Sequence, residues 1–140
     1  MKVLVLNGPN LGRLGTRQPE IYGRTTLAEL EEMLRARGKE LGCEVECVQS
    51  DDAADLIGVL SKSDADAAII NPAALTHYSY ELRDAVAAFA GPVYEVHISN
   101  IYAREPYRRH SLISPVARGS IIGLGITGYL LALEAAVEAR

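Results

Sequence analysis

The sequence contains no apolar run that approaches the roughly 18 residues needed to span a membrane as a helix. The N-terminal stretch "MKVLVLNG" turns polar after six residues, so it does not fit the charged and then apolar pattern of a secretory signal. We therefore expect no membrane partner and a cytoplasmic location.

Cysteine and histidine are scarce, with two and three residues in a chain of 140. Cys43 and Cys47 stand four residues apart in "CEVEC". In an extended segment they would be about 13 Å apart, too far for a disulfide. No histidine stands at ligand spacing from them, so no zinc site is expected. Two buried thiols and no bound metal are the prediction.

Basic residues are fewer than acidic ones, and the resulting net charge of −4 argues against nucleic-acid binding. The basic residues are unevenly spread, however. Residues 1–24 and 97–119 each carry four basic groups and one acid, whereas residues 25–96 carry five basic groups and fourteen acids. Arginine in two loops of an acidic protein favours binding of a small anion such as a carboxylate or phosphate. The alternative is solvated surface charge.

The sequence does contain a regular alternation of short apolar runs and helical patterns. Runs at 2–7, 43–50, 66–71, 92–99 and 119–123 predict five strands, and helical patterns at 25–42, 52–60, 79–89 and 124–139 separate or follow them. Such alternation implies a parallel sheet built from right-handed crossovers. We predict an α/β fold, a flavodoxin-like three-layer sandwich with a five-stranded parallel sheet, as one domain of residues 1–140.

Several helix ends are marked by local signals. Thr26 followed by Glu29 three residues later predicts a capping box, and Gly42 predicts the end of that helix. Asp52 and Ser79 are predicted to cap the next two helices.

Polar residues gather at three of the five predicted strand ends, where open α/β sheets bind their ligands. Asn71 ends the third strand and His77 follows it, although a structural role for His77 is equally consistent with the pattern. Glu95 and His97 stand two apart in the fourth strand and so share a face. A carboxylate beside an imidazole raises its pKa and fixes its tautomer, which suits a general acid. An ordinary ion pair is the alternative.

The segment "NGPNLGRLGTRQPEIYG" follows the first strand. A phosphate-binding turn would feed directly into a helix, but the predicted capping box comes about nineteen residues after the strand ends. The length and the glycines predict a mobile lid instead. Its reactive side chains are Tyr22 and Arg17, because a guanidinium favours the phenolate form of a nearby tyrosine. Alternatively, Tyr22 packs the loop down and Arg17 is solvated.

One motif is misleading. "GLGITG" at 123–128 matches a dinucleotide fingerprint, but no further crossover unit follows it, so we reject a nucleotide site. The glycines are interpreted as close-packing positions of the last helix, against the sheet or a neighbouring subunit. His110 in "YRRHS" is interpreted as a surface or interface residue.

Four long motifs carry a resemblance that covers essentially the whole chain: "LNGPNLGRLGTRQPEIYG", "INPAALTHYSYELRDA", "EVHISNIYAREPYRRHS" and "GLGITGYLLALEA". They resemble the type II 3-dehydroquinate dehydratases. The resemblance implies a lyase (hydro-lyase, EC 4.2.1.10) that converts 3-dehydroquinate to 3-dehydroshikimate by anti elimination through an enolate. It also implies no metal or organic cofactor, and a homo-oligomer of trimers that build a dodecamer. The implied role is the shikimate pathway of aromatic amino acid and chorismate biosynthesis; quinate catabolism uses the same reaction.

The resemblance also implies the catalytic roles. Tyr22 would be the base that removes the proton alpha to the ketone, and Arg17 would hold it ionised. Asn10 would position a water against the enolate oxygen. His97 would protonate the departing hydroxyl, oriented by Glu95.

A second set would bind substrate. Its carboxylate would lie on the backbone amides of Ile98 and Ser99 and on Asn71. Arg108 and His77 would bind ring hydroxyls.

Asp84 would complete the substrate-binding set, in its own site or in that of a neighbouring subunit. Three positions depart from the commonest family pattern. Gln18 stands where glutamate is usual, and Ala73 and Leu75 stand where glycine and tyrosine are frequent. None of these removes a catalytic side chain.

Two other functions remain as alternatives. A flavodoxin-like module that binds phosphate or flavin would have a Ser/Thr-rich loop after the first strand and a helix starting at once. An assembly protein would use its arginines only for subunit contacts, and changing Tyr22 would then remove no activity.

Overall fold

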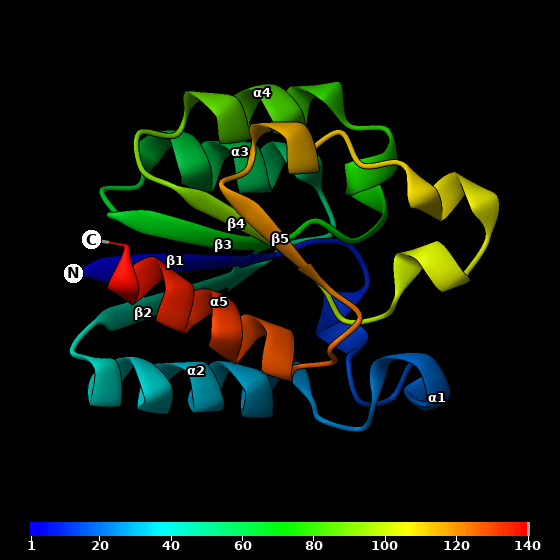
Figure 1. Cartoon of the computed structure of the whole chain (residues 1–140), viewed down its shortest axis with the longest axis horizontal. Helices are drawn as coiled ribbons and strands as arrows, with labels where there is room; N and C mark the ends of the chain where they lie inside the picture. The colour runs from blue at the N-terminus through cyan, green and yellow to red at the C-terminus, as the bar shows by residue number, and fades with distance from the viewer. Residues whose placement is uncertain (140) are drawn as a thin grey trace.

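The strands form a single five-stranded sheet in the computed structural model, which describes residues 1–139 (Figure 1). They are β1 (Lys2–Asn7), β2 (Glu44–Gln49), β3 (Ala67–Asn71), β4 (Val93–His97) and β5 (Gly119–Ile122). Their order is β2-β1-β3-β4-β5, and every neighbouring pair is parallel. The predicted five-stranded parallel sheet is confirmed.

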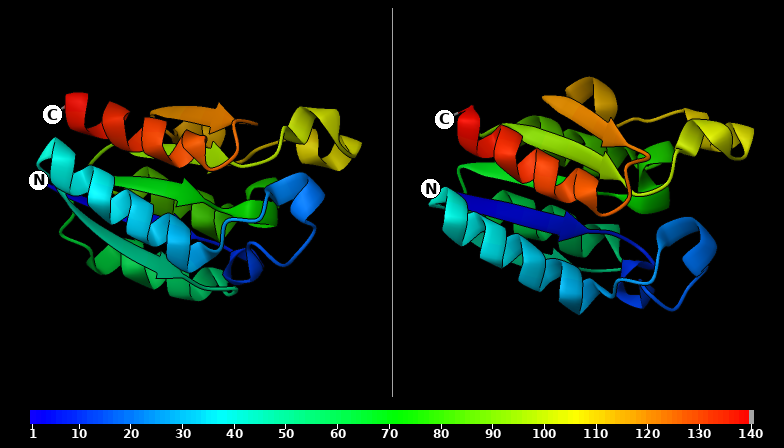
Figure 2. Two further views of the ribbon diagram at one scale, coloured as in Figure 1. Left: turned by 90° about the horizontal axis from the view of Figure 1, so that it is seen from below. Right: turned by 60° about the horizontal axis from the view of Figure 1, so that its bottom comes forward.

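Helices cover both faces of the sheet and complete the predicted three layers (Figures 1 and 2). The α-helices are α1 (Pro19–Tyr22), which lies beyond the sheet, α2 (Leu27–Leu41), α3 (Ala53–Lys62), α4 (Tyr80–Ala88) and α5 (Thr127–Glu138). The helices α2 and α5 lie on one face, and α3 and α4 lie on the other. Short 3-10 helices occupy the loops: η1 (Leu11–Arg13), η2 (Ala73–His77), η3 (Ile101–Ala103), η4 (Pro106–Arg109) and η5 (Ser114–Val116).

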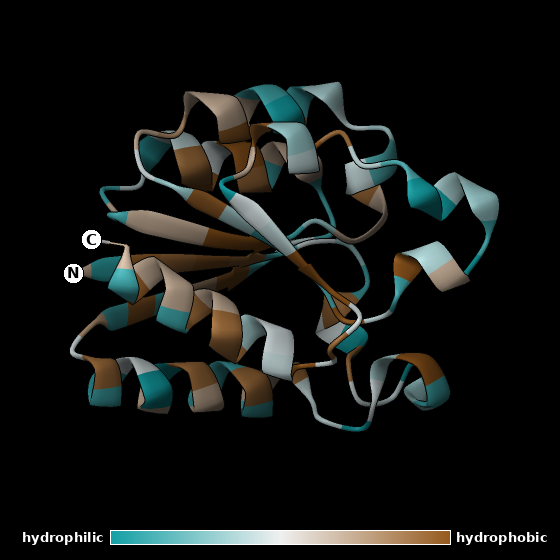
Figure 3. Cartoon of the chain, in the orientation of Figure 1, coloured by the Kyte–Doolittle hydropathy of each residue, from teal (hydrophilic) through white to brown (hydrophobic). Residues whose placement is uncertain are grey.

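The central strands are buried on both faces. All five residues of β3 and of β4 are buried, as are the last five residues of β1. A strand covered by helices on each side is mostly apolar along its length, which explains the near-continuous apolar runs in the sequence. The strands are accordingly among the most hydrophobic segments in Figure 3. Two apolar clusters result, one under α2 and α5 and the other under α3 and α4.

The predicted helix caps are present. Thr26 accepts from the backbone N–H of Glu29, whose carboxylate accepts in return from the N–H of Thr26. Asp52 and Ser79 accept from backbone N–H groups in the first turns of α3 and α4. Gly42 ends α2 with a φ of 79°, a left-handed conformation that costs glycine little.

The two thiols differ in their surroundings. Cys43 is buried as predicted, whereas Cys47 is half-buried at the β2 edge of the sheet. Partial burial disfavours the thiolate and raises the pKa of Cys47 to about 11. Within residues 1–139, no helix is both long enough and apolar enough to cross a membrane.

All five strands point their carboxyl ends toward one edge of the sheet (Figure 1). The N-terminus and the end of α5 lie at the opposite edge. At the carboxyl edge α1 and the segment containing η3 and η4 project beyond the sheet. They lie within the two basic stretches of the sequence, residues 1–24 and 97–119.

Candidate active site

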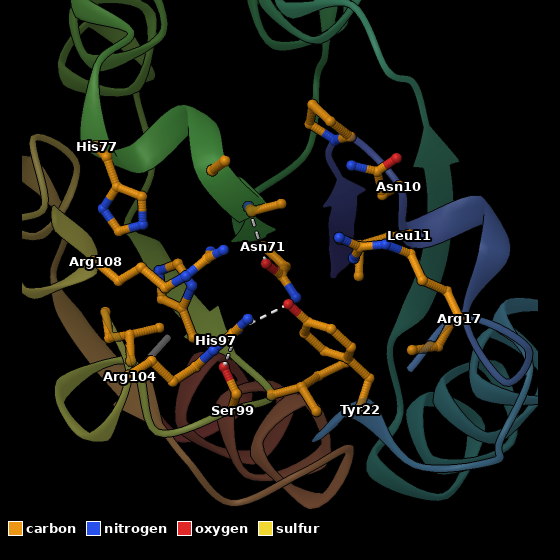
Figure 4. A pocket seen from close by; sticks show the side chains of 16 residues that line it. Asn10, Leu11, Arg17, Tyr22, Asn71, His77, His97, Ser99, Arg104 and Arg108 are labelled. Carbon is orange, nitrogen blue, oxygen red and sulfur yellow. Dashed lines mark hydrogen bonds between the residues drawn. The ribbon is translucent and has the colours of Figure 1, made fainter. Parts of the chain in front are cut away.

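A pocket opens where the parallel strands end (Figure 4). Its walls come from the segments that follow β1, β3 and β4. Of the predicted site residues, these line it: Asn10, Arg17, Tyr22, Asn71, His77, His97, Ile98, Ser99 and Arg108. The rule that ligands bind beyond the carboxyl ends of parallel strands therefore located the pocket correctly.

Glu95 and His97 form the buried side of the site. They share one face of β4, and Nε2 of His97 lies 2.6 Å from Oε2 of Glu95. Glu95 is fully buried, and His97 is 5% exposed at the pocket. An ionised carboxylate can only accept, so Nε2 carries a proton. Nδ1 of His97 is then the ring nitrogen left for a substrate.

Hydroxyl groups from elsewhere in the chain hold the Glu95 carboxylate in place. They belong to Thr76, Ser111, Ser114 and Ser120. Burial alone would raise the pKa of Glu95, but the hydrogen bond and charge interaction with His97 and the hydrogen bonds from Ser114 and Thr76 outweigh it and lower the pKa to about 2. Glu95 is therefore a fixed anion that orients the imidazole of His97.

Tyr22 forms the opposite side of the site, at the end of α1. Nη1 of Arg104 donates to the Tyr22 hydroxyl oxygen at 2.8 Å (Figure 4). The guanidinium carbon of Arg17 lies 5.4 Å from the centre of the Tyr22 ring, and that of Arg104 lies at the same distance. The sequence pointed to Arg17 as the neighbour of Tyr22. The structure places Arg17 beside the ring and adds Arg104, which binds the oxygen itself.

Asn71 and the residues after β4 form the floor between these two sides. Asn71 is 3% exposed, and its Oδ1 accepts from the backbone N–H of Ala73 at 3.1 Å. Ile98 and Ser99 directly follow His97 at the end of β4. The Ser99 hydroxyl accepts from Nη1 of Arg104 at 3.1 Å, so one guanidinium links the floor to Tyr22.

Arg108 and His77 form the outer rim. Nε of Arg108 donates to Glu105 at 2.8 Å, and its guanidinium stacks over the ring of Tyr107. Nδ1 of His77 donates to the backbone carbonyl of His110 at 2.7 Å. Burial disfavours the imidazolium and lowers the pKa of His77. A neutral His77 offers Nε2 as an acceptor. The side chain of His110 is exposed, as predicted for a surface residue.

Asp84 is the one predicted binding residue that lies away from this pocket within the described chain. It stands on α4, its side chain is 76% exposed, and it pairs with Arg83 at 3.2 Å. It lines a different hollow, between α3 and α4. Asp84 therefore does not complete the site of its own chain.

The segment between β1 and α2, predicted to be a mobile lid, is partly helical. It contains η1 and the single-turn helix α1. Leu11 and Leu14 are buried and anchor its first half, while α1 has no buried residue. Gly8 lies so close to β3 that a Cβ would be 2.7 Å from the carbonyl oxygen of Pro72, so only glycine fits there. The first half is thus tied to the sheet by buried residues, whereas in the second half the partly buried Tyr22 packs against the core and accepts from Arg104.

The interpretation of the glycines at 123–128 as close-packing positions of the last helix is confirmed only for Gly128. A Cβ on Gly125 would have no neighbour within 4 Å, and one on Gly123 would meet Asn100. A Cβ on Gly128 would lie 3.2 Å from Ile121 and 3.4 Å from Val96, so glycine lets α5 approach the sheet closely.

Comparison with known proteins identifies relatives that match nearly the whole chain. The model of the family "Dehydroquinase class II" matches residues 1–137. A 3-dehydroquinate dehydratase from Pelotomaculum thermopropionicum is 54% identical over 138 residues, covering 97% of this chain and 96% of that protein. One from Salinispora arenicola is 57% identical over 135 residues, covering 95% and 94%.

Solved structures agree. The type II dehydroquinase from Propionibacterium acnes superposes with a TM-score of 0.94 at 47% identity, covering 98% of this chain and 96% of that one. The enzyme from Butyrivibrio crossotus gives a TM-score of 0.95 at 41% identity, covering 97% of each chain.

Proposed function

Since this chain belongs to the class II dehydroquinases and is a 3-dehydroquinate dehydratase, a hydro-lyase of class EC 4.2.1.10, we propose how its own residues carry out that reaction. One catalytic domain, residues 1–140, removes a proton alpha to the ketone on one side of the substrate and a hydroxyl on the other. The observation that supports this most directly is the pairing of Tyr22 with Arg104 and of His97 with Glu95 in a single pocket.

Tyr22 is the base. A phenol can remove a proton only as the phenolate, and a neighbouring guanidinium favours that form. Arg104 donates to the phenol oxygen and Arg17 lies beside the ring, so both add positive charge where the negative charge forms. Asn10, at the start of η1, positions a water against the enolate oxygen that develops next.

His97 is the acid. Hydroxide is a poor leaving group, so the departing oxygen needs a proton in the transition state. Glu95 holds Nε2 and stabilises the imidazolium, which leaves Nδ1 to give the proton. The two proton transfers occur on opposite faces of the substrate, and the elimination is therefore anti.

The remaining side chains anchor the substrate. Its carboxylate lies on Asn71 and on the backbone amides of Ile98 and Ser99, and Arg108 and His77 bind ring hydroxyls. Glu105 occupies Nε of Arg108. The terminal NH2 groups of the guanidinium are then the donors that would bind a substrate hydroxyl oxygen. Tyr22 takes a proton from the substrate and His97 gives one to it directly, so the proposed reaction needs no metal or organic cofactor.

The experiment that tests this chemistry is the rise in ultraviolet absorbance as the conjugated enone of 3-dehydroshikimate forms. We expect Tyr22→Phe to lower kcat at least about 100-fold, because it removes the base. Tyr94→Phe, which changes a buried tyrosine of β4, should retain activity, and a chelator should leave the rate unchanged. A fully active Tyr22→Phe variant would overturn the assignment of the base, and a chelator-sensitive rate would overturn the cofactor-free mechanism.

We further propose a cytoplasmic homo-oligomer, a dodecamer built as a tetramer of trimers, that serves aromatic amino acid biosynthesis. The exposed position of Asp84 supports assembly, because a substrate-binding role for it requires the pocket of another chain. The pathway proposal predicts that cells without this enzyme require aromatic amino acids for growth. Growth without them, coupled with loss of growth on quinate, would instead show the catabolic role.

A further inference from the structure

A chain of three buried polar side chains runs from α5 to the floor of the pocket. Nδ2 of Asn71 lies 2.8 Å from the Tyr129 hydroxyl, which lies 2.6 Å from Oδ1 of Asn7. Tyr129 and Asn7 are fully buried, and Asn71 is 3% exposed at the pocket wall. Asn7 and Asn71 are paired across the β1–β3 ladder, and Tyr129 reaches both from α5.

The hydrogen bonds in this chain run in one direction. Nδ2 of Asn71 can only donate, so the Tyr129 oxygen accepts there and its own proton must go to Oδ1 of Asn7. Oδ1 of Asn71 already accepts from the N–H of Ala73. Burial disfavours the phenolate and raises the pKa of Tyr129, so it remains a hydroxyl donor. The amide of Asn71 is thereby prevented from flipping.

This arrangement carries one energetic cost and has one packing requirement. Nδ2 of Asn7 is buried without a hydrogen-bond partner among residues 1–139, a cost that native proteins rarely accept without a reason. Tyr129 reaches the strands because Gly128, directly before it, lets the first turn of α5 lie against Ile121 and Val96. Both features are expected where the orientation of one buried amide matters.

We propose that Tyr129 is a positioning residue, which fixes the amide of Asn71 so that its second N–H faces the carboxylate of the substrate. The inference rests on the proposed role of Asn71 as a carboxylate ligand. With the amide held, the pocket presents a donor at this point and accepts an anionic oxygen. A flipped amide would present its carbonyl oxygen and repel the carboxylate.

The test is the separate measurement of KM and kcat in Tyr129→Phe, with Tyr94→Phe, which removes the hydroxyl of another buried tyrosine residue, as the control. An interaction made equally in the ground and transition states affects KM alone. We expect Tyr129→Phe to raise KM about 5- to 10-fold, as loss of part of a charge-assisted hydrogen bond would do, with little change in kcat. Tyr94→Phe should leave both constants unchanged.

A double-mutant cycle distinguishes positioning from general support of the fold. If Tyr129 acts through Asn71, Tyr129→Phe should add no further rise in KM to Asn71→Ala. An equal rise in both backgrounds, or an unchanged KM in Tyr129→Phe when Asn71→Ala raises it, overturns the proposal alone. An unchanged KM in Asn71→Ala overturns the carboxylate role of Asn71, and the positioning role with it.

A second variant serves if Tyr129→Phe does not fold. Asn7→Leu removes the acceptor of the Tyr129 proton and also the unpartnered N–H, while it retains the tyrosine. The freed hydroxyl can then donate to Asn71 and release its amide, so KM should again rise with kcat retained. A wild-type KM in a folded Asn7→Leu variant would overturn the directional chain.

Discussion

At the scale of single residues, Ala73 shows an alanine in a backbone conformation that favours glycine. Its φ of 51° is left-handed, a conformation that costs a residue with a Cβ roughly 1–2 kcal/mol. The bend turns its N–H toward Oδ1 of Asn71. A glycine at this position would adopt the same turn without that cost.

Ala73→Gly should therefore not destabilise the protein, although glycine normally does. Relief of the left-handed strain offsets the larger entropy of the unfolded chain, so we expect the free energy of unfolding to rise by up to about 1 kcal/mol. Ala74→Gly, at the next position of η2 and without a positive φ, should lower it by roughly 0.5–1 kcal/mol. Urea unfolding of the two variants measures both values, and an equal loss in each would contradict the strain at Ala73.

Most of the site was predictable from residue types at strand ends, and the exceptions have physical reasons. Glu95 and His97 stand two apart in one strand, so their pairing follows from the alternation of side chains. Arg104 was not assigned a role by the sequence, where it is one of four basic residues in its segment. It meets Tyr22 across 82 positions of the chain, and no local spacing reports such a contact.

At the scale of elements, the Glu95 carboxylate is a junction. It lies on β4 and accepts hydrogen bonds from four hydroxyl groups. They belong to Thr76 of η2, Ser111 of the loop before η5, Ser114 of η5 and Ser120 of β5. Three segments that follow or flank the strand are thereby tied to one anion. The same charge that orients the catalytic imidazole also holds the rim of the pocket to the sheet.

This junction predicts a loss of stability in acid. The folded-state pKa of Glu95 is about 2, below its ordinary value of 4.5, so the folded state favours ionised Glu95. Its contribution to stability is complete above about pH 4.5 and disappears as the pH falls through 2. Urea unfolding from pH 7 to pH 3 should show Glu95→Gln to be the less stable protein at pH 7, with the difference narrowing in acid.

Thr76→Val is the matched change, because it removes one donor and keeps the carboxylate. It should move the acid-induced loss of stability to a higher pH than in the natural protein. Parallel curves for the natural protein and Glu95→Gln would show that Glu95 has the same pKa in the folded and unfolded states.

The elements themselves were predictable where burial imposes a period. The apolar strands and the capped helices α2, α3 and α4 follow from pattern and caps. The four-residue helix α1 was missed, because it is too short to display a period and none of its residues is buried. Gln18, the residue before α1, has a φ of 43°. This left-handed conformation is uncommon for glutamine, so residue type alone does not predict it.

At the scale of the whole molecule, one predicted binding residue remains separate from the pocket it was assigned to. Asp84 lies on α4 with its side chain exposed, whereas the pocket lies at the carboxyl edge of the sheet. Sequence could not decide whether Asp84 serves its own chain, since it reports no distances. If Asp84 binds substrate, it does so in a neighbouring subunit, and each site is then shared between two chains.

Subunit mixing tests this sharing. The variants Tyr22→Phe and Asp84→Ala should each be impaired as pure assemblies, the first for lack of the base and the second for lack of a binding group. In assemblies refolded from an equal mixture, about a quarter of the sites should combine an intact Tyr22 from one chain with an intact Asp84 from the next, because a cyclic interface pairs unlike surfaces. Activity should therefore recover well above the average of the two parents.

An average value would mean that Asp84 acts within its own chain. A fully active Asp84→Ala would mean that it takes no part in the site, and the inference of shared sites would then have to rest on other residues.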